Sequence, residues 1–194
     1  MATIDQIKQL RQETGVSVSE CKKALEESKS DFEKAKELLR KWGKNLAGKK
    51  SGRSAGQGII DSYIHPNKKV GVLLDIRCES DFVTRLPDFR TLAHEICLQI
   101  AAANPLFLKQ EDIPEKTLEA ERKIYKEQLK TSGKPEKIAS QIVENKIKKY
   151  KEENSLLSQL WIKDDKKTIV ELINEYVAKI GENIVINGFV RYEI

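Results

Sequence analysis

The stretch GIIDSYIHPNKKVGVLLDIRC, residues 58–78, decides the fold. Side chains of one kind recur at every second position on both sides of a turn at Pro66-Asn67. Before the turn, Ile60, Ser62 and Ile64 share one face and Ile59, Asp61 and Tyr63 share the other; after it come Val70, Val72, Leu74 and Ile76. A period of two is typical of β-strands, so this stretch predicts an antiparallel hairpin.

Helical spacing dominates the sequence after this hairpin. Residues 88–103 carry an apolar stripe, and two further helices are expected, one from near Pro114 to Gly133 and one from Pro135 onward. Proline is well tolerated in the first turn of a helix, which supports the last of these starts. The sequence therefore predicts a helix-rich layer beside the hairpin.

The last part of the chain returns from helix to strand. Residues 168–180 are amphipathic at helical spacing, and Gly181 is placed to end that helix. Residues 184–194 are apolar at alternate positions and predict a third strand beside the hairpin. The fold class is α+β, with a small antiparallel sheet packed with helices.

Residues 1–43 predict a separate domain of three short helices. Each helix opens with a pair that forms a capping box, and the pairs are Thr3 with Gln6, Ser17 with Glu20, and Ser30 with Glu33. Gly15 and Gly43 are expected where helices stop. Residues 44–57, KNLAGKKSGRSAGQ, lack an apolar face and are expected to form a basic, glycine-containing linker to a core domain at 58–194.

The composition is that of a soluble, helix-rich protein. Of 194 residues, 34% are charged, and the net charge of +5 is too small to indicate nucleic-acid binding by itself. Three scattered cysteines predict buried free thiols in a reducing compartment. The polar N-terminus and the lack of a long apolar run predict a cytoplasmic protein without a membrane span.

The sequence offers little chemistry for an enzyme. It has no glycine-rich phosphate loop, and its two histidines, His65 and His94, lack neighbours at metal-ligand spacing, so no catalytic residue, metal or cofactor is expected. The unusual segment is Cys78–Thr84, which leaves a strand and precedes a helix. Taken alone, it favours Phe82 as a core residue, with Ser80 and Asp81 capping backbone N–H groups.

Five collinear motifs change that interpretation. LRQETGVSVSECKKALEES at 10–28 resembles the opening signature of the elongation factor Ts family. Cys78–Val83 resembles the second signature, with Ser80 in place of threonine. Gly133–Pro135, the KIGENI run at 179–184 and the closing FVRY at 189–192 also match. The resemblance covers the whole chain in order.

The resemblance implies a nucleotide exchange factor for the GTPase elongation factor Tu, without covalent chemistry. A ubiquitin-associated-like head would dock on the GTPase, and a phenylalanine would push between two of its helices near the magnesium site. The implied contacts in the N-terminal domain are Arg11, Val18, Ser19 and Lys22. The inserted segment, here called the wedge, comprises Asp81, Phe82, Val83 and Thr84, and further contacts are implied at His65, Ile180 and Gly181. Val18 and Ser19 replace a pair of methionines usual in the family.

The resemblance also implies a homodimer. Longer relatives carry two versions of the core in one chain, whereas this chain has one, so a second copy would supply the other half. Some short relatives link the dimer through a cysteine near the C-terminus. Val190 stands at that point here, so a covalent link is not expected.

Two other functions stay open at this stage. One is an RNA- or ribosome-binding protein that uses Lys44–Arg53 and the lysine-rich stretch Lys146–Lys151. The sequence lacks the aromatic residues that single-strand binders interleave with basic ones, so direct nucleic-acid binding is not expected. The other is a ubiquitin-associated-type interaction module without exchange activity.

Overall fold

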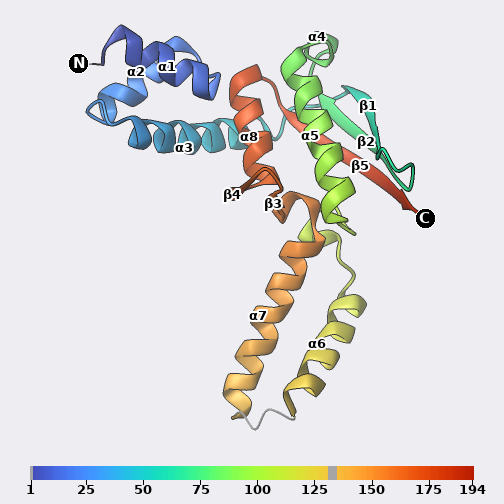
Figure 1. The fold of residues 1–194 in the computed structure, drawn as a ribbon. Helices are drawn as coiled ribbons and strands as arrows, with labels where there is room; N and C mark the ends of the chain where they lie inside the picture. Colours follow the sequence, from blue (N-terminus) through green and yellow to red (C-terminus); the bar gives the residue numbers. More distant parts are fainter. Residues whose placement is uncertain (1, 131–134) are drawn as a thin grey trace.

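The computed structural model describes residues 2–130 and 135–194. The chain begins with a three-helix unit, here called the head, made of α1 (Ile4–Thr14), α2 (Val18–Glu27) and α3 (Phe32–Lys50). Its helices enclose a small core of their own, formed by Leu10, Cys21, Ala24, Leu25, Ala35 and Leu39. In Figure 1 helices α1 and α2 lie at one end of the molecule, and α3 runs from them toward α8.

The starts of the head helices follow the predicted caps in part. Thr3 and Gln6 form the complete capping box, with the Gln6 N–H 3.2 Å from the Thr3 hydroxyl. The Ser17 hydroxyl caps α2 by accepting from the Glu20 N–H. The predicted capping box of Ser30 and Glu33 was wrong. The Asp31 carboxylate accepts from the Lys34 N–H instead, so the cap of α3 lies one residue later than predicted.

Helix α3 is longer than the sequence predicts. Gly43 does not end it, and the linker expected at 44–57 is helical as far as Lys50. Gly43 is buried against α8, where an added Cβ would lie 3.4 Å from the Cβ of Ala178. Ala47, one turn later, packs into the main core. Gly43 is thus a close-packing position, and burial against another helix sustains a stretch that has no amphipathic pattern of its own.

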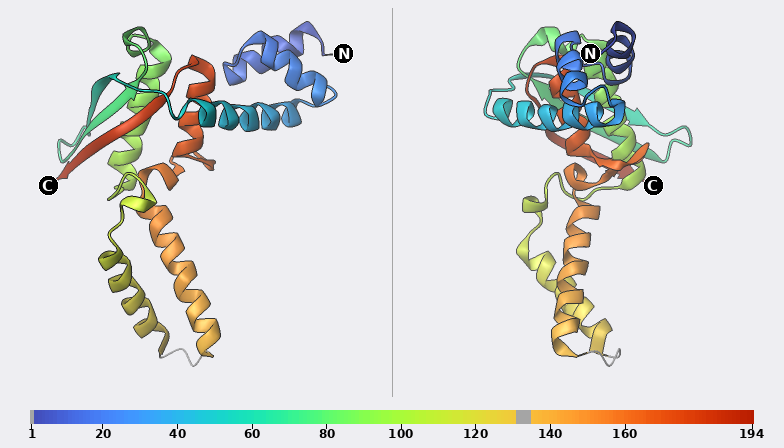
Figure 2. Two further views of the ribbon diagram at one scale, coloured as in Figure 1. Left: turned by 180° about the vertical axis from the view of Figure 1, so that it is seen from behind. Right: turned by 90° about the vertical axis from the view of Figure 1, so that its left-hand side faces the viewer.

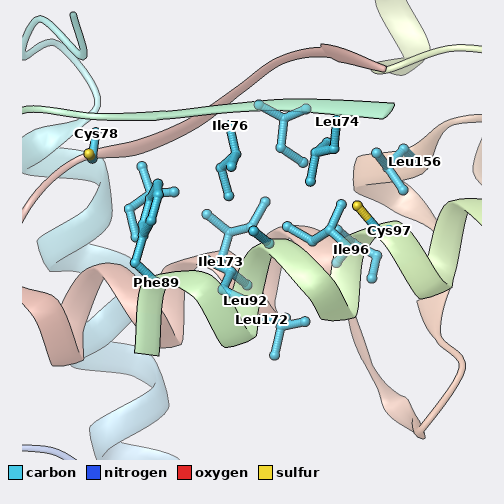
Figure 3. Packing of buried hydrophobic residues seen from close by; sticks show 14 of the residues in the cluster. Leu74, Ile76, Cys78, Phe89, Leu92, Ile96, Cys97, Leu156, Leu172 and Ile173 are labelled. Atoms are coloured by element: carbon cyan, nitrogen blue, oxygen red, sulfur yellow. The ribbon is translucent and has the colours of Figure 1, made fainter. Parts of the chain in front are cut away.

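The main core lies between a sheet and two helices. Within the described residues, β1 (Gln57–Ile64), β2 (Val70–Cys78) and β5 (Ile184–Glu193) form an antiparallel sheet in the order β1-β2-β5. Helices α5 (Pro87–Ala103) and α8 (Ile169–Ile180) cover one face of it (Figure 1). Figure 3 shows Leu74 and Ile76 of β2 pointing toward Leu92 and Ile96 of α5. The fold is α+β, as predicted, and the third strand pairs with the hairpin, as expected.

The other face of the sheet is open. Its register places Leu73 between Ser62 and Val190, and Gly71, two residues before Leu73, between Ile64 and Tyr192. The large apolar side chains on this face are exposed, and they are Ile60, Ile64, Leu73, Val185, Val190 and Tyr192. Figure 2 shows the sheet from two further sides.

Two helices project from the core as an antiparallel pair, here called the arm. They are α6 (Glu115–Lys130) and α7 (Glu136–Asn154), and both views in Figure 2 show them extending away from the rest. The expected end of the first helix at Gly133 lies outside the described residues. Leu118, Val143 and Ile147 of the arm are buried in a small cluster with Ile113, which precedes α6.

Short elements that the sequence did not predict join the arm to the core. Turns of 3-10 helix at Gln110–Asp112 and Leu156–Ser158 flank the arm. A two-stranded ribbon, β3 (Leu160–Trp161) with β4 (Asp164–Thr168), then leads into α8. The capping box of Thr168 and Glu171 starts α8, and Gly181 ends it in the left-handed conformation at φ 87°, as predicted.

Candidate functional site: an exposed aromatic corner

A single helical turn, α4 (Asp81–Thr84), joins β2 to α5, and this strand-to-helix segment is here called the corner. Phe82 lies on its outer side with 74% of its surface exposed, whereas Val83 is only 5% exposed and belongs to the main core. Successive residues of a helix point about 100° apart, so anchoring Val83 inward turns Phe82 outward. The interpretation of Phe82 as a core residue was therefore wrong.

The burial of Val83 also bears on its expected role. A side chain enclosed by its own core has almost no surface to offer a partner. Val83 anchors the corner from inside the main core, and its contact with a partner stays a prediction. Leu86, one turn after Phe82, is 41% exposed and extends the apolar surface at this point.

The polar residues before Phe82 bond to the loop between α8 and β5. The carboxylate of Glu182 accepts from the Ser80 N–H at 2.9 Å and from the Ser80 hydroxyl at 2.6 Å. In the opposite direction, the carboxylate of Glu79 accepts from the Asn183 N–H at 2.7 Å. The Ser80 hydroxyl therefore donates to Glu182. It was expected to cap α4, and this expectation was wrong.

The end of α3 bonds to the same loop. The ammonium of Lys50 donates to the Gly181 carbonyl, and the Asn183 side chain donates to the Arg53 carbonyl at 2.9 Å. Arg53 also forms an ion pair with Glu79 at 3.6 Å. The last turn of the longest head helix, the α8–β5 loop and the corner are thus joined by one set of polar contacts.

Asp81 and Thr84 stabilise the single turn of α4 itself. The Asp81 carboxylate pairs with Arg85 at 3.0 Å, and the Thr84 hydroxyl donates to the Asp81 carbonyl at 2.6 Å. The side chains of this ion pair are largely exposed, so its contribution to stability is about 1 kcal/mol or less. The Asp81 side chain remains accessible at the surface.

The structure brings some of the remaining sequence-predicted residues close to the corner. Gly181 immediately precedes Glu182, and Ile180 is half-buried at the end of α8. His65 lies elsewhere, on the exposed tip of the β1–β2 hairpin, where its Nδ1 is 3.0 Å from the Tyr63 hydroxyl. The predicted residues therefore form two separate surfaces on the core.

The four head residues are exposed. Arg11 lies on α1, and Val18, Ser19 and Lys22 lie on the first turns of α2. Lys22 forms an exposed ion pair with Glu26 at 3.8 Å. Gly15, between these helices, adopts φ 67° and packs against Lys179 of α8, where an added Cβ would lie 2.6 Å from Lys179 Cε. The head is therefore fixed to the core near the end of α8.

The three cysteines are buried free thiols, as predicted. Burial raises the pKa of Cys97 to about 12, and burial together with the nearby Glu182 carboxylate raises the pKa of Cys78 to about 11. Such thiols are unreactive at neutral pH, because the thiolate is the reactive form. Cys78 packs beneath the corner, and its thiol donates to the Ser80 carbonyl.

Neither a metal-binding cluster nor a membrane-crossing helix is found in the part of the chain that the structure describes. Among residues 2–130 and 135–194, no group of three or more His, Cys, Asp or Glu residues could hold a metal ion. In the same two ranges, every helix is too short or too polar to cross a bilayer. The feature that stands out is the fixed corner with its outward phenylalanine.

The corner and the head both place their sequence-predicted residues at the surface, except Val83. A model of the family described as Elongation factor TS matches residues 2–194. A relative named Elongation factor Ts from Thermoanaerobacter sp. (strain X514) is 47% identical over 193 residues, covering 100% of this chain and 95% of the relative. The relative of that name from Thermosipho melanesiensis is 48% identical over 188 residues, covering 97% and 96%. The chain belongs to the elongation factor Ts family, a family of translation elongation factors.

The contacts that hold the corner were missed by the sequence analysis. Glu79 and Glu182 are far apart in the chain, and Ser80 and Glu182 are 102 positions apart. Nothing in either local pattern indicates the pairing. The one signal in the sequence is that Glu79 directly follows the predicted strand ending at Cys78, and Glu182 directly follows Gly181, the predicted end of a helix.

Proposed function

We propose that this protein is a guanine nucleotide exchange factor for elongation factor Tu, and that Phe82 is the side chain it inserts near the magnesium site of that GTPase. The observation that carries the proposal is a 74% exposed phenylalanine on a corner that is fixed on both sides. Leu86, 41% exposed, extends the apolar surface of Phe82, and contiguous exposed apolar patches mark protein–protein interaction sites. Membership in the elongation factor Ts family supports the same partner.

The reaction is a change of binding partners, so the protein acts as a binding catalyst and makes or breaks no covalent bond. Magnesium bridges the phosphate oxygens of GDP to oxygens of the GTPase, and disturbing it weakens the hold on nucleotide. By linkage, the factor weakens nucleotide binding by the same ratio by which nucleotide weakens binding of the factor. In a cell this exchange would take place in the cytoplasm, during translation elongation.

Phe82 alone does not account for a large acceleration. Burying one phenylalanine yields about 1.5–3 kcal/mol, whereas a thousandfold faster release requires a barrier lower by roughly 4 kcal/mol. We assign the remainder to the other contacts of the corner. The exposed head residues Arg11, Val18, Ser19 and Lys22 supply the affinity that brings Phe82 to its target. Docking by the head raises the effective concentration of the wedge at its target.

Three further groups complete the proposed contact. Asp81 and Thr84 flank the wedge, and Asp81 is accessible for a partner donor. Ile180 and Gly181 extend the surface along the adjoining loop. His65 lies on a separate part of the core, so one protomer of a dimer would present it to a partner engaged by the corner of the other.

The experiment is release of a fluorescent GDP analogue from elongation factor Tu in a stopped-flow instrument. Phe82→Ala is expected to lower the accelerated rate about 10- to 100-fold, as the loss of a buried phenylalanine predicts. Leu106→Ala is the matched control, because Leu106 is a comparably exposed apolar residue that follows the opposite end of α5. Release by Phe82→Ala at the wild-type rate would refute the wedge.

The open face of the sheet supports a homodimer. Exposed Ile64, Leu73 and Tyr192 lie on three adjacent strands, and a second copy could cover them by two-fold packing of the same face. Leu73→Glu is expected to shift the mass in sedimentation from twice 22.1 kDa toward 22.1 kDa. Leu106→Glu adds the same charge away from this face. A monomeric wild-type chain, or a dimer unaffected by Leu73→Glu, would overturn this assignment.

A further inference from the structure

We infer that Glu182 is a positioning residue for the exchange reaction, acting through Phe82 and not through contact with the partner. The inference rests on the proposed function. It identifies a residue outside the wedge that the wedge requires. The argument starts from the fact that Phe82, being 74% exposed, has few contacts of its own to hold it in place.

The short helix under Phe82 cannot fix its own orientation. Helix α4 comprises four residues, Asp81–Thr84, and a helix of one turn is not stable by itself. Its direction therefore depends on what holds its two ends. On the C-terminal side of Phe82, Val83 is buried in the main core and holds the chain through apolar contacts.

On the N-terminal side, the hold is polar and comes from Glu182. Both oxygens of one carboxylate accept from Ser80, at 2.9 Å from its backbone nitrogen and 2.6 Å from its hydroxyl. A bidentate contact of this kind fixes direction as well as distance, and hydrogen bonds to a charged acceptor are stronger than neutral ones. Ser80 and Val83 are thus the two anchors between which Phe82 is held outward.

Glu182 is itself held in place by its neighbours in the α8–β5 loop. Lys50 donates to the carbonyl of Gly181, and the Asn183 N–H donates to Glu79. Since Lys50 closes the head helix α3, the loop that carries Glu182 is fixed to the element that leads from the head. Two carboxylates therefore link the corner to the end of the head helix α3: Glu182 bonds to Ser80, and Glu79 bonds to Asn183 and Arg53.

Replacement of Glu182 separates positioning from folding and from affinity. Alanine removes both acceptors, so the Ser80 N–H loses its acceptor and the corner is free to reorient. Glutamine can accept from the Ser80 N–H through its carbonyl and donate to the Ser80 hydroxyl through its amide. Glutamine should therefore restore the corner without restoring the charge.

The test measures release of a fluorescent GDP analogue from elongation factor Tu over a range of concentrations of the full chain. Glu182→Ala should lower the saturated rate about tenfold, because the Ser80 N–H and hydroxyl lose their charged acceptor. A tenfold change in rate corresponds to a barrier higher by roughly 1.4 kcal/mol. The half-saturating concentration should stay within about twofold, because the head is unchanged. Glu182→Gln should restore most of the rate. In a chain that already carries Phe82→Ala, adding Glu182→Ala should cost clearly less than the tenfold that it costs in the wild-type chain.

Several results would overturn the inference. A saturated rate unaffected by Glu182→Ala would show that the corner needs no such anchor. Glutamine as poor as alanine would show that the charge acts and not the positioning. Independent, multiplying effects of Phe82→Ala and Glu182→Ala would mean that Glu182 acts directly on the partner. By contrast, an unaffected rate for Phe82→Ala alone would refute the proposed function itself.

A second pair of variants, at Ser80, distinguishes a loss of positioning from a loss of folding. Thermal unfolding of each variant is recorded first, and if Glu182→Ala is unfolded, Ser80 is used instead. Ser80→Ala removes the hydroxyl donor and retains the N–H, so the saturated rate should fall about threefold. Ser80→Thr restores a hydroxyl and should restore the rate. Failure of either expectation in a folded variant would contradict the positioning role.

Discussion

The corner and the arm both expose large apolar side chains, yet the structure holds them in different ways. At the corner, Phe82 lies between a residue buried in the main core and a bidentate contact to Glu182. On the arm, Ile124 and Ile138 are exposed on two helices whose shared core has four buried residues. The comparison teaches that exposure indicates a binding role most strongly where the surrounding backbone is fixed.

The polar contacts of the corner and of the arm differ in whether they involve the backbone. Those of the corner involve backbone groups, namely the N–H groups of Ser80 and Asn183. Those that bridge the two arm helices join exposed side chains, such as Arg122 with Glu144 and Lys146 with Gln128. Contacts to backbone fix the path of the chain, whereas exposed side-chain pairs contribute little to stability.

The largest expected effect tests whether the arm is independent of the corner. Ile147→Ala removes a buried side chain from the small arm core and should lower the local stability of the arm by about 2–4 kcal/mol. Hydrogen exchange of the amides of α6 and α7 should accelerate, while nucleotide release stays within about twofold of the wild-type rate. A large loss of release activity would mean that the arm takes part in exchange.

The head provides the next test, because it should supply affinity and not wedge geometry. Lys22→Glu reverses a charge on an exposed side chain and should raise the half-saturating concentration about tenfold, with the saturated rate unchanged. Lys23→Glu on the same helix is the matched control. A lower saturated rate with unchanged half-saturation would contradict this division of roles.

A smaller effect concerns the core that anchors the corner, and it depends on pH. Burial raises the pKa of Cys97 from 9.0 to about 12, so the folded state keeps this proton while the unfolded state loses it above about pH 9. This contribution to stability is fully present below pH 9 and is lost as pH rises toward 12. Urea unfolding of wild type and Cys97→Ala should therefore show a difference that shrinks between pH 8 and pH 10.5. A constant difference would contradict the raised pKa.

The smallest expected effect is at the ion pair on the corner. Arg85→Ala removes the partner of Asp81, and since the pair is exposed, release should change by less than about threefold. Asp81→Asn should cost more, because the proposal has Asp81 meet the partner. If both variants lowered release equally, Asp81 would serve to hold the turn through Arg85.

Local patterns predicted the elements of this fold well where each element's own residues decide its structure. The alternation in residues 58–76 predicted the β1–β2 hairpin, and Gly15 and Gly181 take the left-handed conformations that end helices. Prediction failed where packing decides. Gly43 resembles a helix stop but is a contact with Ala178, and residues 44–50 are helical because Ala47 and Lys50 are buried against the core.

The sequence assigned a candidate site to the corner, and that assignment stays a prediction; the contacts that hold the corner were not predicted. The family signature pointed to Asp81 and Phe82, whereas residue pattern alone favoured a buried Phe82. The signature includes Val83 beside Phe82 because a sequence motif does not show the direction of each side chain. In the helical turn the two side chains point in different directions, and Val83 is buried. The pairing of Ser80 with Glu182 depends on the folded arrangement of β2, α8 and β5, which short sequence patterns do not encode.

The central claim is that the Phe82 ring, in water in the free protein, becomes enclosed by elongation factor Tu. It is tested most directly by placing 4-fluorophenylalanine at position 82 and recording its fluorine NMR signal with and without the nucleotide-free GTPase. The same label at Phe89, which is fully buried, is the control. The account predicts a large shift and loss of solvent sensitivity at position 82, with little change at position 89. An unshifted, solvent-sensitive signal at position 82 in a complex shown to have formed would contradict it.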